Sequence, residues 1–261
     1  MRKSKNRLLL LIAGIFILIS ASWTASAEYS ETEAAEMYNN AGNLYQSNFY
    51  ADALNIYEEL VNDGIENPDL FYNSSNAAFR AGSIGKAILY VEKALKLNPS
   101  DPDALSNLRF LNSRKQDREP PQDNIVIAFL ARHYNYINMN SAALWSGISF
   151  AMAMLFAAGA LYAYGWVRQF FAAASVALGL MFVLSTGILI QKAGRAGRVV
   201  EAVIMGSEVN AYSGPGEDNT HIFIIHEGTK VVIERSQNSW NLIRLRSGAG
   251  GWIKADAMED I

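Results

Sequence analysis

Two apolar stretches dominate the chain: residues 142–164 read AALWSGISFAMAMLFAAGALYAY, and residues 170–190 read FFAAASVALGLMFVLSTGILI. Neither stretch contains Asp, Glu, Lys or Arg. As α-helices they would be about 34 Å and about 31 Å long, which matches a bilayer's hydrocarbon core of about 30 Å. Only residues 165–169 separate them, so we expect a two-helix transmembrane hairpin with a short turn. The alternative, a buried soluble helical pair, would show a polar face on its helices.

The composition agrees with a chain that is only partly exposed to water. Of its 261 residues, 51% are apolar and 18% are charged, and the formal net charge is −3. Ordinary soluble domains carry about 25% charged residues. The sequence contains no cysteine, which excludes disulfides, a thiol nucleophile and a Cys-ligated zinc site.

The N-terminus has the features of a secretory signal peptide over residues 1–27. Four basic residues precede Leu8, residues 8–19 are apolar, and Ala25-Ser26-Ala27 provides a small-residue cleavage site. An uncleaved anchor is the alternative. In either case residue 28 onward begins outside the cytoplasm. The turn of the hairpin is then cytoplasmic, and the segments before and after the hairpin are both in the periplasm.

The basic residues near the hairpin argue against that orientation. Arg168 is the one basic residue of the turn, whereas Lys192, Arg195 and Arg198 follow the second stretch. Lys and Arg normally accumulate on the cytoplasmic side of a membrane. We give the signal peptide more weight, because the first hydrophobic element usually sets the orientation.

Charge is unevenly distributed along the chain. Residues 28–121 hold 15 acidic and 8 basic residues, residues 122–198 hold 1 and 5, and residues 199–261 hold 9 and 5. Acidic segments are poor candidates for nucleic-acid binding, since phosphate contacts need clustered Lys and Arg. The apolar stretches lack acidic and basic residues, which argues against an ion or proton pathway.

The segment that follows the signal peptide repeats itself with a period of 34 residues. A shift of 34 aligns identical residue types: Tyr38 with Tyr72, Asn39 with Asn73 and Asn107, Ala53 with Ala87, and Pro68 with Pro102. This is the period of the tetratricopeptide repeat, and residues 85–99, GKAILYVEKALKLNP, resemble that family closely. The resemblance implies an all-α tetratricopeptide solenoid over residues 28–118, with two repeats and a capping helix at 103–113.

Both repeats depart from the family pattern. In the first, Leu60 and Ile65 stand where a small residue and a proline are usual. In the second, Ser74 and Ser75 replace the usual Leu-Gly, which we expect to loosen that helix contact.

Solenoids of this kind bind peptides or partner helices along their concave side. The candidate protein-binding residues are polar and recur with the repeat: Asn39, Asn73, Asn76, Arg80 and Asn107. Amides donate and accept hydrogen bonds at once, which suits an extended peptide backbone. The asparagines could instead hydrogen-bond within the repeat and hold its helices in register, and we give that interpretation more weight.

Two linkers connect the hairpin to the rest of the chain. Residues 119–141 contain Pro120-Pro121 and then a mixed apolar and basic run, which either lies flat at the membrane interface or continues the first membrane helix. Residues 191–200 form a basic linker. Within the hairpin, Ala143, Gly147 and Ala151 recur every four residues, a spacing that favours close packing of the hairpin or of a partner helix.

Residues 201–261 alternate between short strand patterns and turn residues. We expect strands at residues 231–235, 240–245 and 252–254, in a small all-β barrel of about five strands. The stretches VNAYSGP at 209–215, HEGTKV at 226–231 and GWI at 251–253 resemble a bacterial SH3 domain. The candidate groove residues, for a wall peptide or a protein tail, are Tyr212, Trp240 and Trp252. A core position is the alternative, which we favour for Trp252.

The order of these segments, from signal peptide to SH3-like end, resembles the BatE family of the Bacteroides aerotolerance group over essentially the whole chain. The resemblance implies a multi-pass protein of the bacterial cytoplasmic membrane. It implies a complex with other Bat proteins, which carry von Willebrand A modules, beside a MoxR-type ATPase. It also implies a role in oxidative or envelope stress.

The sequence shows no catalytic constellation. The three histidines, His133, His221 and His226, are not spaced as metal ligands, and neither a nucleophile elbow nor a phosphate loop occurs. We therefore expect no enzyme activity, no cofactor and no metal site. The prediction is a membrane-anchored envelope adaptor that binds partner proteins. The alternative is a cell-wall sensor whose SH3-like end binds peptidoglycan.

Overall fold

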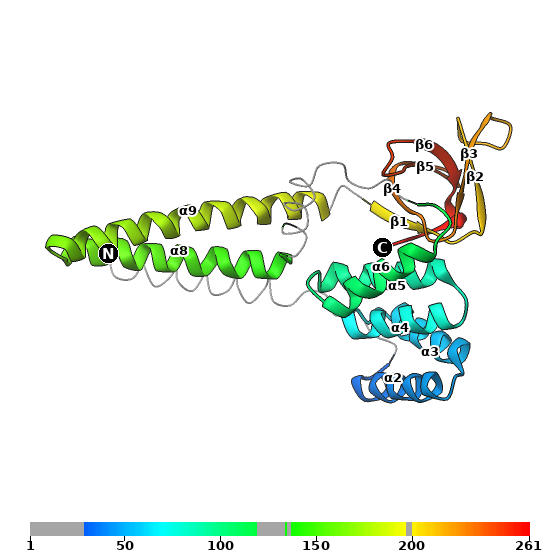
Figure 1. Cartoon of the computed structure of the whole chain (residues 1–261), viewed down its shortest axis with the longest axis horizontal. Helices are drawn as coiled ribbons and strands as arrows, with labels where there is room; N and C mark the ends of the chain where they lie inside the picture. The colour runs from blue at the N-terminus through cyan, green and yellow to red at the C-terminus, as the bar shows by residue number, and fades with distance from the viewer. Residues whose placement is uncertain (1–28, 119–133, 135–136, 197–199) are drawn as a thin grey trace, which may run out of the picture.

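The computed structural model of this protein describes residues 29–118, 134, 137–196 and 200–261. The expected signal peptide and most of the linker at 119–141 lie outside these residues. The described chain consists of a helical module (α2–α6), an apolar hairpin (α8 and α9) and a sheet module (β1–β7). Figure 1 shows the two modules stacked on each other at the open end of the hairpin, with the hairpin's turn at the far end.

The helical module is a stack in which each helix packs on its neighbours in sequence. Ser30 and Glu33 form a capping box, and Asn67 and Asp101 accept hydrogen bonds from first-turn amides of the helices that follow them. These caps set the starts of three of the five helices: α2 (Glu31–Gln46), α3 (Tyr50–Asn62), α4 (Pro68–Arg80), α5 (Ile84–Leu97) and α6 (Pro102–Arg114).

Small residues let these helices approach one another closely. Ala41, Ala53, Ala77 and Ala87 are fully buried in the core that the five helices share. Leu60, which departs from the repeat pattern, is also buried there. A larger side chain at this position therefore fills the core instead of disrupting it.

The two serines of the second repeat, which we expected to loosen a helix contact, are both hydrogen-bonded, and one of them bonds across that contact. Ser74 Oγ donates to Leu70 O at 2.8 Å within α4, and Ser75 Oγ donates to Ala87 O at 2.7 Å. The second bond joins α4 to α5. Both serines are fully buried. A buried hydroxyl group requires a hydrogen-bond partner inside the protein, and each of these bonds provides one.

Both apolar stretches are helical, and their helices are longer than expected. Helix α8 spans Met139–Tyr162 and helix α9 spans Gly165–Ala196, which leaves only Ala163 and Tyr164 between them. The predicted turn at 165–169 and the start of the predicted linker at 191–200 are therefore wrong. The second apolar stretch excludes Arg168, Gln169 and Lys192, but Arg, Lys and Gln are good helix formers, and α9 includes all three residues. By length and composition, both helices are able to cross a membrane.

Hydroxyl groups and aromatic rings join the two helices of the hairpin, and the ring pairs include Phe150 with Phe182 at 5.2 Å and Phe156 with Phe171 at 5.5 Å between centroids. Ser146 Oγ and Thr186 Oγ1 lie 2.7 Å apart, and Ser175 Oγ donates to Ala153 O at 3.0 Å. Phe171 packs so closely on Gly159 that a Cβ there would lie 2.9 Å from its ring. The stripe Ala143, Gly147 and Ala151 is exposed, so it does not pack within the hairpin, and its contact with a partner helix stays a prediction.

The sheet module is a seven-stranded antiparallel sheet in the order β3-β2-β6-β5-β4-β1-β7. The three predicted strands coincide with β4, β5 and β6, although β5 ends one residue earlier than predicted, and this confirms them. Strands β1, β2, β3 and β7 were not among the predicted strands. The bounds are β1 (Val200–Ile204), β2 (Glu208–Tyr212), β3 (His221–His226), β4 (Lys230–Gln237), β5 (Trp240–Arg244), β6 (Gly250–Lys254) and β7 (Met258–Asp260).

The sheet is open where we expected a barrel. Its hydrogen-bonded order ends at β3 on one side and at β7 on the other. Closure is limited at both edges: β7 has only three residues, and the backbone N–H of His226 in β3 donates to a side chain outside the sheet, Asp117. The core on one face is formed by aliphatic side chains that include Ile204, Ile243 and Ile253.

Candidate functional site

The asparagines predicted to bind a peptide mostly join neighbouring helices. Asn73 Nδ2 donates to Tyr38 Oη at 2.6 Å, and Asn107 Nδ2 donates to Asn76 Oδ1 at 3.0 Å. Asn39 is exposed on α2. These contacts are those expected if the asparagines hold the helices in register. Each amide has further donor and acceptor positions, so these bonds do not exclude a bound peptide.

Arg80, the fifth predicted residue, belongs to a row of aromatic and arginine side chains at one end of the helical module. Its guanidinium lies 4.3 Å from the ring centroid of Tyr50, to whose hydroxyl it also donates. Arg114 lies in the same way 5.0 Å from the centroid of Phe110, which packs edge-on against Phe79. Phe110 is 41% exposed. Sequence reasoning missed this row, because its members come from three different helices.

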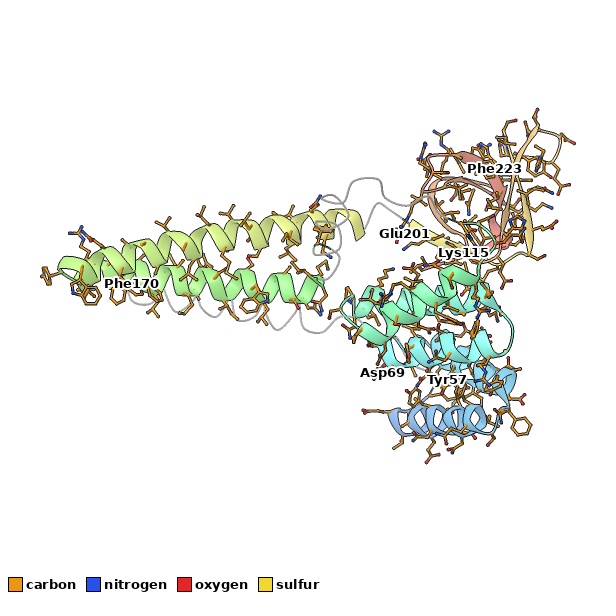
Figure 2. The ribbon with its side chains drawn as sticks, viewed as in Figure 1. Tyr57, Asp69, Lys115, Phe170, Glu201 and Phe223 are labelled. Carbon is orange, nitrogen blue, oxygen red and sulfur yellow. The ribbon has the colours of Figure 1, made fainter. Side chains whose placement is uncertain are left out.

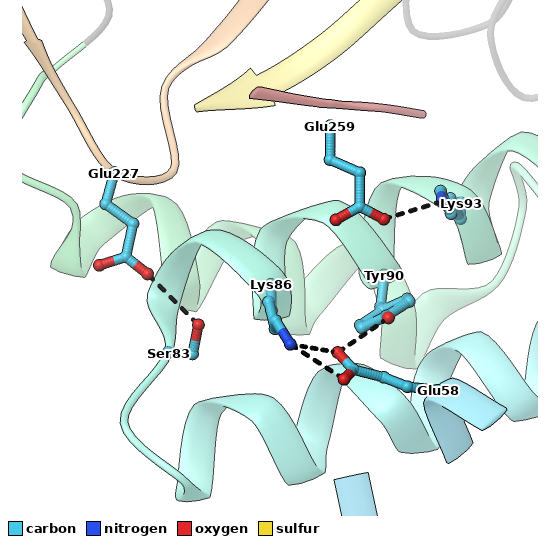
Figure 3. Close-up of polar contacts among 7 residues, drawn as sticks. All are labelled: Glu58, Ser83, Lys86, Tyr90, Lys93, Glu227 and Glu259. Atoms are coloured by element: carbon cyan, nitrogen blue, oxygen red, sulfur yellow. Dashed lines mark hydrogen bonds and ion pairs between the residues drawn. The ribbon is translucent and has the colours of Figure 1, made fainter. Parts of the chain in front are cut away.

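A second polar cluster lies between α3 and α5, as Figure 3 shows. Glu58 of α3 pairs with Lys86 at 2.6 Å and accepts a hydrogen bond from Tyr90 Oη at 3.1 Å. Burial, together with the nearby carboxylate of Glu58, raises the pKa of Tyr90 well above its usual range. Tyr90 therefore stays a neutral donor, and the cluster is a structural link between helices.

The three predicted groove residues of the sheet module share one face of the sheet. Tyr212 and Trp240 pack edge-on with ring centroids 5.6 Å apart. Trp252 pairs with Tyr212 on one side and with Leu242 on the other, and directly opposed residues point to the same face. Trp252 is only 8% exposed, yet it lies outside the aliphatic core of the opposite face. Tyr212 and Trp240 are half-buried and form the accessible part of this aromatic face.

The sheet module docks on helix α5 through an apolar centre. Val203 of β1 is fully buried among the core residues of the helical module, and Met205 packs against the same core. Two glycines permit this approach. A Cβ at Gly85 would lie 3.0 Å from Ile204 O, and a Cβ at Gly228 would lie 2.7 Å from Ile88 Cδ1. A few side chains of the sheet module therefore join the core of the helices, while the rest of the sheet keeps a core of its own.

Charged side chains surround this apolar centre. Lys230 Nζ lies 3.0 Å from Glu92 Oε2 on α5 and 2.9 Å from Glu201 Oε2 on β1. Burial acts to lower the pKa of Lys230, but the two carboxylates outweigh it and raise the pKa above its usual range. Lys93 and Glu259 form a longer pair at 3.7 Å (Figure 3). We call the apolar centre and its charged rim the joint; Figure 2 shows Glu201 where sheet and helices meet.

Asp117 extends the joint to the segment that follows α6. Its Oδ2 accepts hydrogen bonds from the backbone N–H of His226 and from Thr229 Oγ1, both at 2.8 Å. Its Oδ1 lies 2.8 Å from Nδ1 of the His226 ring. Burial acts to raise the pKa of Asp117, but these hydrogen bonds outweigh it and lower the pKa below its usual range. The carboxylate is therefore held ionised.

Among the residues that the structure describes, no three His, Asp or Glu side chains are grouped so that they could hold a metal ion. No protein-family model matches this chain, and a search of curated proteins finds no match either. The functional interpretation therefore rests on the joint, the aromatic row, the aromatic face and the hairpin.

Proposed function

We propose that this protein is a non-enzymatic, membrane-anchored adaptor. In this proposal α2–α6 are tetratricopeptide repeats with a capping helix, α8 and α9 cross the bacterial cytoplasmic membrane, and β1–β7 form an SH3-like domain. The observation that carries the proposal is that the helical and sheet modules lie at the same end of the apolar hairpin and that the sheet docks on the helical core through Val203. Both modules then face one aqueous compartment, where they present their surfaces to the same partners.

The resemblance to the BatE family suggests what those partners are. Other Bat proteins with von Willebrand A modules, and a MoxR-type ATPase complex, are the first candidates. The aromatic row of the helical module is the surface that we assign to protein binding, because aromatic and arginine side chains supply most of the binding energy at protein interfaces. Phe49, which is 57% exposed, adds to this surface.

The partner proposal is tested by co-expression of the full-length chain with a candidate Bat protein, followed by co-purification in detergent. The variant Arg80→Glu with Phe110→Ala changes exposed side chains of the row, and we expect it to lose the partner. Arg244→Glu, on the exposed surface of the sheet, is the matched control and retains it. Equal recovery with both variants contradicts binding through the row. Deletion of the helices is a poor test, because it exposes Val203.

The proposed topology has its own test, which the absence of cysteine makes simple. We place a single cysteine at Tyr164, which is 89% exposed at the turn, at Asp52 in the helical module or at Ser236 in the sheet module. A membrane-impermeant maleimide should label positions 52 and 236 in spheroplasts, and position 164 only after lysis. Labelling at 164 alone would place both modules in the cytoplasm, as the basic residues near the hairpin suggest.

The aromatic face favours a second candidate function, a cell-wall sensor. Tyr212 and Trp240 form a rigid, half-exposed aromatic pair of the kind that binds peptides or sugars. The test is co-sedimentation of the detergent-solubilised full chain with purified peptidoglycan. Loss of sedimentation in Trp240→Ala, but not in the control Trp145→Ala on the hairpin, supports the sensor. No sedimentation of the unchanged chain argues for the adaptor alone.

A further inference from the structure

Arg80 and Arg114 are 34 residues apart, which is the period of the sequence repeat, and each ends a helix of the helical module. Arg80 is the last residue of α4, and Arg114 is the last residue of α6. The two helices contact each other at this end, where Phe79 packs edge-on against Phe110 with ring centroids 5.2 Å apart. The repeat therefore places two exposed arginines on neighbouring helix ends.

Each of these guanidinium groups lies on an aromatic ring that a second ring holds in place. Arg80 lies 4.3 Å from the ring centroid of Tyr50, and Tyr50 packs edge-on against Tyr45 with centroids 5.2 Å apart. Arg114 lies 5.0 Å from the centroid of Phe110, whose ring is held edge-on in the same way. The face of an aromatic ring attracts a cation, which restricts the positions that the arginine side chain adopts. Both guanidinium groups are therefore held in place before any ligand binds.

Neither arginine has a carboxylate partner among the described residues. Carboxylates are plentiful, because residues 28–121 hold 15 acidic and 8 basic residues, and two lysines of the same module, Lys86 and Lys93, do form ion pairs. A guanidinium group has five N–H donors in a planar fork and binds a carboxylate through two parallel hydrogen bonds. Arg80 and Arg114 thus present two fixed cations that are able to bind two carboxylates.

The spacing and the exposed rings indicate what kind of chain carries those carboxylates. The axes of helices in contact lie about 8–10 Å apart, so guanidinium groups on neighbouring helix ends are separated by on the order of 10 Å. A polyproline II segment advances about 9 Å in a turn of three residues and presents every third side chain on one face. Phe110 and Phe49, which are 41% and 57% exposed, offer apolar contact area beside the arginines.

We propose that the aromatic row binds an extended acidic segment of a partner protein. Carboxylates at every third position of the segment pair with Arg80 and Arg114, and apolar side chains between them pack on the exposed rings. This inference rests on the proposed function, in which the row is the protein-binding surface, and adds the chemistry of the bound segment. A phosphate polymer also carries anions, but it has no apolar side chains to cover the rings.

The test measures peptide binding to the full-length chain in lipid nanodiscs by fluorescence anisotropy. The probe is a labelled synthetic peptide of repeated Glu-Pro-Leu, and the comparison peptide is repeated Gln-Pro-Leu. We expect the Glu peptide to bind at least about tenfold more tightly, and Arg80→Ala and Arg114→Ala each to weaken its binding about tenfold. High salt should weaken the binding further, because the arginines are exposed.

The matched control is Arg109→Ala, which removes an exposed arginine from the same helix as Arg114. Arg109 Nε donates to Leu105 O at 3.2 Å within α6, and its loss should leave peptide binding unchanged. Equal binding of the Glu and Gln peptides overturns the proposal, as does an equal loss in Arg109→Ala and Arg114→Ala. Tighter binding of inorganic polyphosphate than of the Glu peptide also overturns it, in favour of a phosphate polymer. If one arginine variant does not fold by circular dichroism, the other decides.

This test and the co-purification test can fail separately. A partner that is recovered through the row, while the Glu peptide does not bind, overturns the acidic segment and leaves the adaptor in place. Binding of the Glu peptide without recovery of a Bat protein supports the acidic segment and overturns the named partner.

Discussion

The joint and the apolar hairpin are two interfaces of the same chain that use polar groups in opposite ways. The joint surrounds a small apolar centre with ion pairs, among them Lys230 with Glu92 and Glu201. The hairpin joins its helices through hydroxyl groups, as between Ser146 and Thr186, and through the packing of Phe171 on Gly159. Among the described hairpin contacts, a basic side chain takes part only near the end of α9, where Lys192 Nζ lies 4.6 Å from the ring centroid of Tyr134. The contacts given above between α8 and α9 involve hydroxyl and aromatic groups.

The difference reflects the surroundings that each interface tolerates. Charges at the joint keep part of their hydration at its rim and stabilise a defined geometry. Charged groups between helices in lipid would lose all hydration. A hydroxyl group can instead form a hydrogen bond with a backbone carbonyl or with another hydroxyl. Changes in pH and in salt concentration should therefore alter the stability of the joint and leave the stability of the hairpin unchanged. The predictions below test this contrast, beginning with the largest expected effect.

The apolar centre of the joint should be the most sensitive position. Val203→Asp places a charge in the shared core, where Val203 is fully buried, and we expect a loss of about 4 kcal/mol or more in the free energy of unfolding. Thermal unfolding in detergent, followed by circular dichroism, measures this loss. Val200→Asp, on the same strand but exposed, should change little. Equal stabilities of the two variants would mean that the sheet does not dock on the helices.

The ion-pair centre of the joint should come next. Lys230→Met leaves two carboxylates without their cation and should cost about 2–3 kcal/mol, less than a fully buried pair because Glu201 is partly exposed. Since the pKa of Lys230 is raised in the folded chain, its contribution is complete below the unfolded value of about 10.4. It is lost as the pH rises through the folded pKa.

Unfolding by denaturant at a series of alkaline pH values tests both the cost of Lys230→Met and the loss of the Lys230 contribution as the pH rises. The unchanged chain should lose stability in this range, and Lys230→Met should lose less. Lys254→Met is the comparison: the exposed pair with Glu217 also raises the pKa of Lys254, but solvent screens that pair, so its removal should change the alkaline dependence less than Lys230→Met does. If the free energy of unfolding fell equally with rising pH in all three chains, Lys230 would not be the titrating group.

The attachment of Asp117 should have a smaller effect, with the opposite dependence on pH. Asp117→Asn weakens hydrogen bonds to an ionised acceptor and should cost about 1–2 kcal/mol at neutral pH. Because the pKa of Asp117 is lowered on folding, its contribution is present above the unfolded value of about 3.9. It is lost as the pH falls through the folded pKa.

Acid unfolding distinguishes this attachment from the rest of the acidic chain. The difference between Asp117→Asn and the unchanged chain should shrink as the pH approaches 3 and should be constant above about pH 5. Asp256→Asn, an exposed substitution on the sheet module, provides the baseline. A difference that grows in acid would mean that the protonated side chain makes the stabilising contacts.

Much of the fold was predictable because its signals are local. The apolar stretches predicted two helices, the 34-residue period predicted an all-α segment at 28–118 where α2–α6 lie, and alternation predicted β4, β5 and β6. The errors have local causes too. The second apolar stretch excluded Arg168 and Lys192, although both lie within α9 and Arg and Lys favour helices. Strands β1 and β7 carry no alternation, and β2 and β3 were not predicted either.

The joint was not predictable, because its partners are far apart in sequence. Lys230 and Glu92 are 138 residues apart, and Asp117 and His226 are 109 apart. In the sequence each of these residues looks like an ordinary solvated charge. The predicted site residues of the sheet module lie together on one face: Tyr212, Trp240 and Trp252. The predicted asparagines of the helical module, Asn73, Asn76 and Asn107, instead form hydrogen bonds between neighbouring helices.

The hairpin should give the smallest effect and the clearest contrast. Thr186→Val keeps the shape of the side chain but removes the hydroxyl that bonds Ser146, and interhelical hydrogen bonds in membranes contribute about 0.6 kcal/mol on average. Unfolding in mixed micelles measures the loss, which should be the same at pH 5 and pH 9 and at low and high salt. Ser185→Ala, whose hydroxyl bonds only within α9, is the control. A loss larger than that of Lys230→Met, or one that varies with pH, would show that the hairpin is not the uncharged interface described here, and the contrast with the joint would disappear.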